Sequence, residues 1–338
     1  RIATEEAFAP PEMIDMYLDI LKEPDVDPGF NSLWGFYGTS KSERAQFIFD
    51  SLQDLGARRI ADMDARGIDR QIIAITSPGT QILPNDKAVA LSILANDQLG
   101  EACRSHPDRF TGMAACALED GEGAAKEIER AVHKYGFRAV IVNSHTHGQY
   151  LDNPKFWPVL EAAEALDLPV YIHPNTPPRN MIGPMLEAGL DGAVFGFGVE
   201  TGLHALRVIT SGTLDRFPKL KIIIGHMGEA LPYWMYRLDF MHGAGVRSKR
   251  YDVMQPLELG LVSNYLKERF YVTNSGMAWE PAIKFAQQVL GEDRVLYAMD
   301  YPYQCPVEEV IALDNMDMPL ETKKKFFQTN AEHVFRLA

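Results

Sequence analysis

The sequence predicts an α/β fold, a single (β/α)8 barrel of the TIM type that spans residues 1–338. Short apolar, β-branched runs alternate with amphipathic helical patterns almost from end to end, and four of the runs end on a side chain able to bind a metal. The clearest run is Ile222–Ile224, which is followed by Gly225-His226-Met227-Gly228-Glu229. Its length and branching are typical of a buried parallel strand. With no repeat, linker or low-complexity segment, we place no internal domain boundary.

Eight segments have the pattern of strands, and a helical pattern follows nearly every one. The expected strands are residues 1–8, 70–76, 110–117, 139–143, 168–174, one around Ile222, 269–274 and 294–299. The expected helices are residues 57–67, 85–106, 121–135, 156–166, 202–212, one after residue 229, 281–290, and two that close the chain at residue 338. We expect Asn85 to cap the helix that begins there.

Two long segments lack a regular pattern and are rich in Pro, Gly and aromatic residues: 9–40 and 175–201. Loops of this length inside a compact domain are usually functional. We expect both to be long loops over the C-terminal face of the strands, and the segment 9–40 to form a lid or a substrate wall.

Composition excludes several classes of protein. Hydrophobic residues make up 46% and charged residues 23%, and the net charge is −13, which argues against a nucleic-acid partner and an anionic membrane surface. No apolar run reaches membrane length, and we expect no signal peptide. The three cysteines form no zinc-type pair. A cytoplasmic location is therefore expected.

The strand ends carry a set of side chains suited to a metal. Glu5 lies near the end of the first expected strand and His173 near the end of the fifth, while His226 follows the sixth and Asp300 follows the eighth. Only a closed barrel brings such distant positions to one mouth. Carboxylate and imidazole together make a mixed site that suits Zn²⁺, Mn²⁺ or Fe²⁺.

The blocks TEEAF, YIHP, GHMGE, MDYPY and NAEHVFRL, spread over nearly the whole length, carry a resemblance to a known family. The chain resembles the amidohydrolase superfamily, and within it the decarboxylases related to aminocarboxymuconate-semialdehyde decarboxylase and γ-resorcylate decarboxylase. The resemblance implies a metal-dependent enzyme, a carboxy-lyase, that removes CO2 without oxidation from an ortho-hydroxybenzoate. The substrate implied is 5-carboxyvanillate, converted to vanillate in the catabolism of lignin-derived aromatics.

The resemblance also implies the metal ligands, namely Glu5, His173 and Asp300, with His226 either beyond the ligands or beside the substrate. Relatives carry a histidine where this chain has Ala7, so one usual ligand is absent. Such a carboxylate-rich site favours one Mn²⁺, with Zn²⁺ the second choice. Asn143 stands where relatives with two metals have a lysine or glutamate. No organic cofactor is expected.

The resemblance assigns further roles near the metal. Asp300, His226 and Glu229 are the expected catalytic residues, with Asp300 as the proton donor. Glu229 either is only a charge at a helix start or pairs with His226 and fixes its tautomer. The residues expected to bind substrate are Arg44, Thr76, Arg237 and Tyr303. Arg237 matches an arginine that relatives project into the site of a neighbouring subunit, and each arginine has a surface salt bridge as its alternative.

Other histidines are less informative. His145 and His147 have the spacing of the metal-binding H-x-H pair of hydrolytic relatives, but they follow the fourth strand instead of lying on the first. We expect them to serve the loop or line the substrate site. The alternative functions are hydrolysis of a lactone or amide, with Asp300 as base, and a non-catalytic binding barrel. The expected partners are a small aromatic carboxylate and further copies of the chain, as a homodimer or homotetramer.

Overall fold

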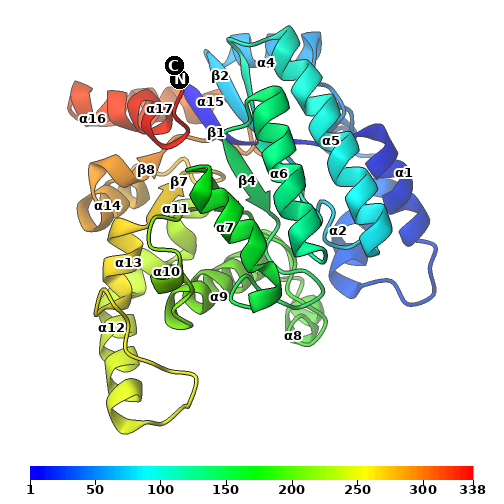
Figure 1. The fold of residues 1–338 in the computed structure, drawn as a ribbon. Coiled ribbons are helices and arrows are strands. Elements are labelled where there is room, and N and C mark those ends of the chain that lie inside the picture. Colours follow the sequence, from blue (N-terminus) through cyan, green and yellow to red (C-terminus); the bar gives the residue numbers. More distant parts are fainter. Residues whose placement is uncertain (338) are drawn as a thin grey trace.

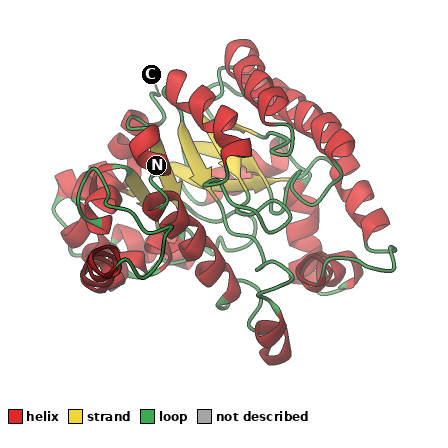
Figure 2. Ribbon diagram, turned by 60° about the horizontal axis from the view of Figure 1, so that its bottom comes forward, coloured by secondary structure: helices red, strands yellow, loops and turns green. Residues whose placement is uncertain are grey.

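The structure, a computed structural model, describes residues 1–337; Ala338, the last residue of the expected domain and of its final helix, lies outside the described residues. Eight parallel strands form one sheet whose order follows the chain. The strands are β1 (Ile2–Phe8), β2 (Arg70–Ile75), β3 (Phe110–Ala114), β4 (Ala139–Val142), β5 (Pro169–Ile172), β6 (Lys221–Ile224), β7 (Phe270–Thr273) and β8 (Val295–Leu296). Helices surround the sheet (Figures 1 and 2), which confirms the predicted (β/α)8 barrel.

The helices carry the following bounds, and three short segments of 3₁₀ or π type accompany them. They are α1 (Pro11–Ile20), α2 (Pro28–Thr39), α3 (Glu43–Leu52), α4 (Ala57–Ala65), α5 (Asn85–Ser105), α6 (Gly121–Tyr135), α7 (Trp157–Ala165), α8 (Gly183–Ala188), α9 (Gly196–Thr210), α10 (Thr213–Arg216), α11 (His226–Glu229), α12 (Leu231–Ser248), α13 (Val262–Glu268), α14 (Glu280–Leu290), α15 (Val307–Asp314), α16 (Leu320–Lys324) and α17 (Asn330–Val334). The short segments are η1 (Pro154–Phe156), η2 (Glu292–Arg294) and η3 (Lys325–Thr329).

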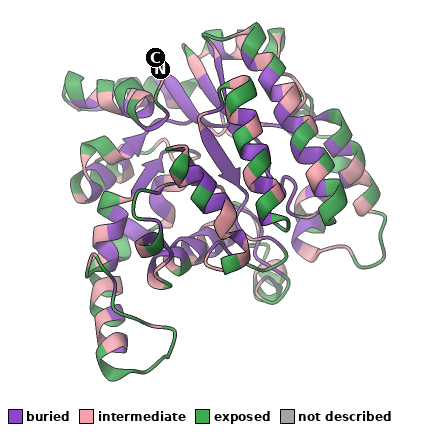
Figure 3. Cartoon of the chain, in the orientation of Figure 1, coloured by how far each residue is buried: buried purple, intermediate pink, exposed green. Residues whose placement is uncertain are grey.

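The barrel closes between β1 and the chain that follows β8. The backbone N–H of Thr4 donates to the Tyr297 carbonyl at 3.0 Å, and that of Ala7 donates to the Tyr301 carbonyl at 2.8 Å. Every residue of β4, β5 and β7 is buried, as expected for parallel strands covered on both faces. Figure 3 shows this buried centre and the exposed outer faces of the helices.

Two strands end three residues earlier than predicted, because side chains take over backbone hydrogen bonds there. β3 ends at Ala114, and the next residue, Ala115, bonds through its N–H to Asn96 Oδ1 at 2.9 Å. β8 ends at Leu296, and the N–H of Ala298 bonds to Asn274 Oδ1 at 2.9 Å.

The segment 9–40 is not the irregular loop that the sequence predicted. It folds into α1 and α2, each of which begins with a proline at its first helical position. Proline is favoured there because its missing N–H would have no helical partner. Asp27 caps α2 by accepting from the N–H groups of Gly29 and Phe30, both at 3.0 Å. The prolines therefore mark helix starts.

The segment 175–201 is also more ordered than predicted, since it contains α8 and the first turn of α9. The helix predicted to begin at Gly202 begins six residues earlier, at Gly196. Glycines lower helix propensity, but a Cβ at Gly198 would lie 3.1 Å from Glu229 Oε2, so a small residue is needed at this contact. Asn85 is also not a cap; Pro84 precedes α5, and no side chain caps it.

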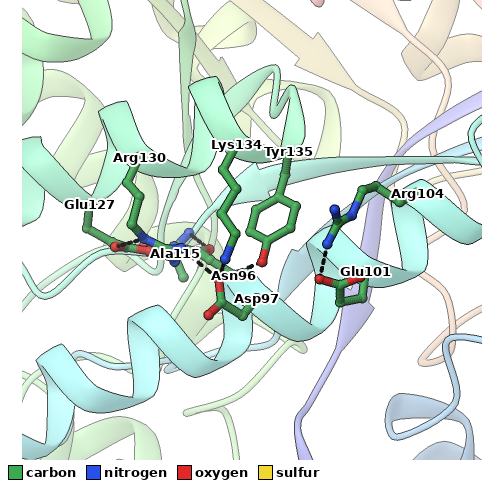
Figure 4. Close-up of polar contacts among 9 residues, drawn as sticks. All are labelled: Asn96, Asp97, Glu101, Arg104, Ala115, Glu127, Arg130, Lys134 and Tyr135. Atoms are coloured by element: carbon green, nitrogen blue, oxygen red, sulfur yellow. Dashed lines mark hydrogen bonds and ion pairs between the residues drawn. The ribbon is translucent and has the colours of Figure 1, made fainter.

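A buried polar network joins α5 and α6 to the end of β3 (Figure 4). Asn96 donates to the Ala115 carbonyl at 2.8 Å and to Glu127 Oε1 at 2.7 Å, while also accepting from the Ala115 N–H. Glu127 in turn accepts two hydrogen bonds from Arg130, at 2.7 and 2.8 Å. One amide side chain therefore fixes the chain where it leaves β3.

Asn96→Ala is expected to lower the free energy of unfolding by about 2–4 kcal/mol, because buried partners lose their hydrogen bonds. Urea unfolding followed by circular dichroism measures the change. Lys134→Ala, which removes an exposed side chain of the same region, is the control and should change stability by less than about 0.5 kcal/mol. Equal effects of the two substitutions would contradict this account of the network.

Candidate active site

A bulge in β1 directs two consecutive glutamates into the protein. Ala3 pairs with Gln71, but Glu6 pairs with Ile73, so β1 holds one residue more than β2 over this stretch. Such bulges change the direction in which side chains point, and they are common beside active sites. Glu5 points among β5, β6 and β7, and Glu6 points toward the end of β8; both are buried.

The carboxylate of Glu5 has one oxygen bonded and one without a partner. Its Oε2 accepts from the hydroxyls of Tyr171 and Thr273, the latter at 2.9 Å. Its Oε1 is buried and has no hydrogen-bond partner within the described chain. A Cβ at Gly225 would lie only 2.9 Å from Glu5 Oε2, so the glycine of the GHMGE block makes room for this carboxylate.

His173 faces this unpartnered oxygen with a nitrogen that carries no proton. Its Nδ1–H donates to the Pro174 carbonyl at 2.9 Å, so Nε2 holds a lone pair, and it lies 3.4 Å from Glu5 Oε1. Burial lowers the pKa of His173 to about 3, with the nearby His226 adding to the effect, so the ring is neutral and the contact is not an ion pair. Two buried acceptors that face each other at this distance fit a bound cation.

His226 also faces Oε1 of Glu5 and is held by Glu229. Its Nδ1 is 2.7 Å from Glu229 Oε1, and its Nε2 is 4.0 Å from Glu5 Oε1. Burial alone would lower the pKa of His226, but the carboxylates of Glu229 and Glu5 outweigh burial and raise it to about 10. The structure therefore contains the His226–Glu229 pair, the second of the two alternatives considered for Glu229.

The backbone that carries this pair, α11, is a tight turn with left-handed φ values and not the regular helix start that the sequence predicted. His226, Met227, Glu229 and Ala230 have φ values of 51°, 56°, 52° and 61°. Non-glycine residues adopt such values uncommonly, and their persistence indicates that the surroundings enforce them. The turn brings the Glu229 carboxylate back over the imidazole, and α12 begins only at Leu231.

Asp300 completes the group from the end of β8. A Cβ at Gly276 would lie 3.4 Å from His226 Cδ2 and 3.5 Å from Asp300 Oδ2, which places these two side chains on either side of that glycine. Asp300 also lines one small cavity with Glu5 and His173. Burial and the neighbouring Glu5 raise the pKa of Asp300 well above its ordinary value.

Glu5, His173, His226 and Asp300 therefore meet at one mouth of the barrel, as the sequence predicted. Within residues 1–337, no three His, Cys, Asp or Glu side chains are arranged as a complete set of metal ligands. The group suits a cation through the chemistry of its donors: an unpartnered carboxylate oxygen, an unprotonated imidazole nitrogen and a further carboxylate.

Three of the four predicted substrate residues lie together beside this group. Thr76 Oγ1 and the Tyr303 hydroxyl are 2.6 Å apart, and Arg44 donates to the Tyr303 carbonyl at 2.9 Å. The rings of Tyr37 and Tyr303 meet edge to face at 5.9 Å between centroids. Because Tyr37 is on α2, the helices of the segment 9–40 form a wall beside the site.

Arg237 is separate from this group. It is exposed on α12, the helix that extends away from the barrel in Figure 1, and makes no ion pair with any described residue. His145 and His147 lie in the loop after β4, where His145 Nε2 contacts the Thr176 carbonyl at 2.9 Å. These two histidines line a cavity of about 610 Å³ with Asn175 and Arg179, apart from the Glu5 group.

Sequence reasoning missed several residues that shape the site. Tyr171 and Thr273 hold Glu5, Gly225 and Gly276 leave space for the reactive side chains, and Glu6 bonds the backbone beside Asp300. Tyr171 had a signal, because it lies two residues before His173 on one strand and so faces the same side. The others depend on contacts between strands distant in sequence.

Comparison with known proteins places the chain in a family. The sequence profile of the family described as Amidohydrolase matches residues 49–337. γ-Resorcylate decarboxylase from Polaromonas sp. (strain JS666) is 35% identical over 294 residues, which cover 85% of this chain and 89% of that protein.

Solved structures give the same placement. A 5-carboxyvanillate decarboxylase from Novosphingobium aromaticivorans, solved with manganese and 4-hydroxy-3-methoxy-5-nitrobenzoic acid, is 59% identical with a TM-score of 0.98, over 100% of this chain and 96% of that one. The 2,6-dihydroxybenzoate decarboxylase from Rhizobium is 30% identical with a TM-score of 0.86, over 100% of this chain and 98% of that one. These similarities confirm the resemblance found in the sequence. The chain belongs to the amidohydrolase family, in its decarboxylase branch, and is an enzyme of the carbon–carbon lyase class.

Proposed function

We propose that this protein removes CO2 from an ortho-hydroxybenzoate, and that its substrate is 5-carboxyvanillate, which it converts to vanillate. The observation that carries the substrate assignment is the 59% identity, over the whole chain, to a 5-carboxyvanillate decarboxylase. The residues beside the site are compatible with this substrate, since Thr76, Tyr303 and Arg44 offer two hydroxyls and a cation next to Asp300. The pathway would be the catabolism of lignin-derived aromatics, and residues 1–338 would act as one catalytic unit in the cytoplasm. Within the described residues, no helix is long and apolar enough to cross a membrane.

We further propose that Glu5, His173 and Asp300 hold one divalent metal. The unpartnered Oε1 of Glu5 and the lone pair of His173 Nε2 support this ligand set. A donor set with two carboxylates and one imidazole favours Mn²⁺ over Zn²⁺. The similar structure with bound manganese supports the same choice. We propose that the reaction uses no organic cofactor.

When bound, the metal would supply the positive charge that holds the phenolic oxygen and the adjacent carboxylate of the substrate. Asp300 then transfers its proton to the ring carbon that bears the carboxylate. The bond from that carbon to the carboxylate breaks, its electron pair restores the aromatic ring, and CO2 leaves. Asp300 is left as a carboxylate and regains its proton from water.

Other residues orient the substrate and keep its surroundings fixed. Arg44 neutralises negative charge at the mouth, which matters in a protein with a net charge of −13. The His226–Glu229 pair fixes the imidazole that faces Glu5. The aromatic side chains of α2 beside Tyr303 exclude water from the ring.

A panel of substrates tests the function. Protein loaded with Mn²⁺ is incubated with 5-carboxyvanillate, with γ-resorcylate, and with esters and lactones of similar aromatic acids. Vanillate and CO2 should form in equal amounts from 5-carboxyvanillate, faster than any other acid is consumed. Turnover of γ-resorcylate alone would refute the substrate assignment, acid release from the esters or lactones would favour a hydrolase, and no turnover would favour a binding protein.

We propose that the protein acts as a homodimer or homotetramer, joined in part through α12. The apolar residues of this helix, Leu231, Trp234, Met235 and Leu238, are only partly available, because Leu231 is buried and packs in the core. The outward side chains are instead Tyr233 at 80%, Tyr236 at 85% and Phe240 at 60% exposure. An apolar stripe beside the exposed Arg237 fits a second copy of the chain.

Mixing two variants tests whether Arg237 serves the partner's site. Asp300→Asn should be nearly inactive, and Arg237→Met should have a raised KM. Equal amounts, mixed and allowed to exchange subunits, should recover about a quarter of the wild-type activity, because half of the dimers then hold one intact site. No recovery after exchange, which mass photometry can follow, or a fully active monomer, would contradict a shared site.

A further inference from the structure

Glu6 is a buried carboxylate for which the proposed reaction has no use. Its side chain is 1% exposed, and it lies next to Glu5 but points the other way, toward the closing seam of the barrel between β1 and the end of β8. Burying a carboxyl side chain carries a cost in free energy unless its hydrogen-bonding groups find partners. The contacts of Glu6 should therefore explain why a carboxyl group is buried here.

The contacts of Glu6 replace part of the sheet. Beyond Leu296, the carbonyls of Tyr297 and Tyr301 still accept from β1, but N–H groups of this segment bond to side chains. Met299 donates its N–H to Glu6 Oε1 at 2.9 Å, and Tyr301 donates its N–H to Glu6 Oε2 at 3.2 Å. One carboxylate therefore holds the backbone N–H groups of the two residues that flank Asp300.

Asp300 needs such support, because its own backbone is strained. Its φ is 66°, in the left-handed region that a residue with a Cβ adopts at a cost of roughly 1–3 kcal/mol. The direction of the Asp300 carboxylate depends on this conformation. Two hydrogen bonds on its flanking N–H groups hold it in place.

Glu6 is itself held from behind. Gln71 donates to Glu6 Oε2 at 3.4 Å and accepts from Arg59 Nη1 at 3.2 Å. The Arg59 guanidinium is fully buried, donates to the Ala7 carbonyl at 2.7 Å, and lies 4.8 Å from the centre of the Tyr301 ring. Arg59 therefore contacts both sides of the seam and supplies the charge opposite Glu6.

We propose that Glu6, supported by Gln71 and Arg59, is a positioning residue that holds the backbone of Asp300 in the conformation from which its side chain reaches the substrate. The proposal rests on the proposed role of Asp300 as proton donor. The competing explanation is that Glu6 only closes the barrel and neutralises Arg59. The two explanations make different predictions. Only the positioning role makes the rate of the chemical step depend on the length of the side chain at residue 6.

Two substitutions at Glu6 distinguish the effect of side-chain length from the effect of charge. E6Q keeps the size, but its amide NH2 would face one of the two backbone N–H groups, so one hydrogen bond is lost. E6D keeps the charge opposite Arg59 but is one methylene shorter, so it cannot accept from both N–H groups. In both variants, kcat should fall roughly 10- to 100-fold, because small misplacements of a reacting group have effects of this size. KM should change less than about threefold, since the groups that bind substrate are untouched.

E127Q is the matched control, since Glu127 is also a buried glutamate that accepts from an amide and an arginine, but in the α5–α6 network of Figure 4. It should lose stability to a similar degree while keeping kcat within about twofold. Melting temperatures of all variants are measured in parallel. If E6Q does not fold, E6D tests the proposal, because its carboxylate still compensates the charge of Arg59.

Wild-type kcat in E6D, or a loss of kcat in E127Q equal to that in E6Q, would overturn the proposal. A crystal structure of E6Q gives a readout independent of turnover, and φ of Asp300 should leave the left-handed region. An unchanged φ would also overturn it. Wild-type protein that decarboxylates no substrate, with φ displaced in E6Q, would instead refute the proposed function and leave the positioning role intact.

Discussion

Asp300→Asn is expected to lower kcat on 5-carboxyvanillate by more than the ~10²–10⁴-fold typical of a general acid, because the change removes the transferable proton and also weakens the metal site. The amide keeps the size and one oxygen of the carboxylate. Asp317→Asn, an exposed carboxylate on the same C-terminal segment, is the control and should keep wild-type activity.

The two effects of Asp300→Asn separate when Mn²⁺ is varied. Saturating Mn²⁺ should restore metal content but not turnover, because metal loading returns no proton donor. Initial rates of vanillate formation, followed by absorbance, give kcat at each metal concentration. A variant that turns over at a near wild-type rate, or recovers fully with added metal, would contradict the role of Asp300 as donor.

His173→Ala should remove both metal and activity, since Nε2 of this ring is the unprotonated nitrogen opposite Glu5 Oε1. The wild type should hold about one divalent ion per chain after desalting, and the variant less than about a tenth of one. Elemental analysis by inductively coupled plasma mass spectrometry gives the stoichiometry. Chelation of the wild type should abolish activity, and added Mn²⁺ should restore it.

His147→Ala is the matched control for the metal experiment, because His147 is an exposed histidine in the loop after β4. Its metal content should equal that of the wild type. Two tightly held ions per wild-type chain, or full activity after chelation and desalting, would contradict a site with one metal.

The barrel and the meeting of Glu5, His173 and Asp300 were predictable from sequence because both depend on periodicity along the chain. Parallel strands of four to eight residues alternate with helices, and their carboxyl ends must face one mouth. The β-branched side chains of a run such as Ile222–Ile224 also favour a buried strand over other structures. Any side chain at the end of such a strand is then placed within a few ångströms without knowledge of its contacts.

The remaining features depend on contacts between distant segments. The bulge that separates Glu5 from Glu6 is defined by pairing with β2 and by the seam with β8, so it has no local signature. The left-handed turn at Met227, Glu229 and Ala230 goes against the preferences of its own residues and is fixed by packing against α9. Proline is compatible both with a helix start and with a loop. Only the fold shows that Pro11 and Pro28 begin helices.

The most direct test of non-oxidative decarboxylation is the reaction of the Mn²⁺-loaded wild type with 5-carboxyvanillate in D2O, analysed by mass spectrometry and NMR. The account predicts one CO2 for each vanillate, and one deuterium on the ring carbon that carried the lost carboxylate, because Asp300 exchanges its proton with solvent before each turnover. Vanillate without deuterium at that carbon, or consumption of substrate without release of CO2, would contradict it.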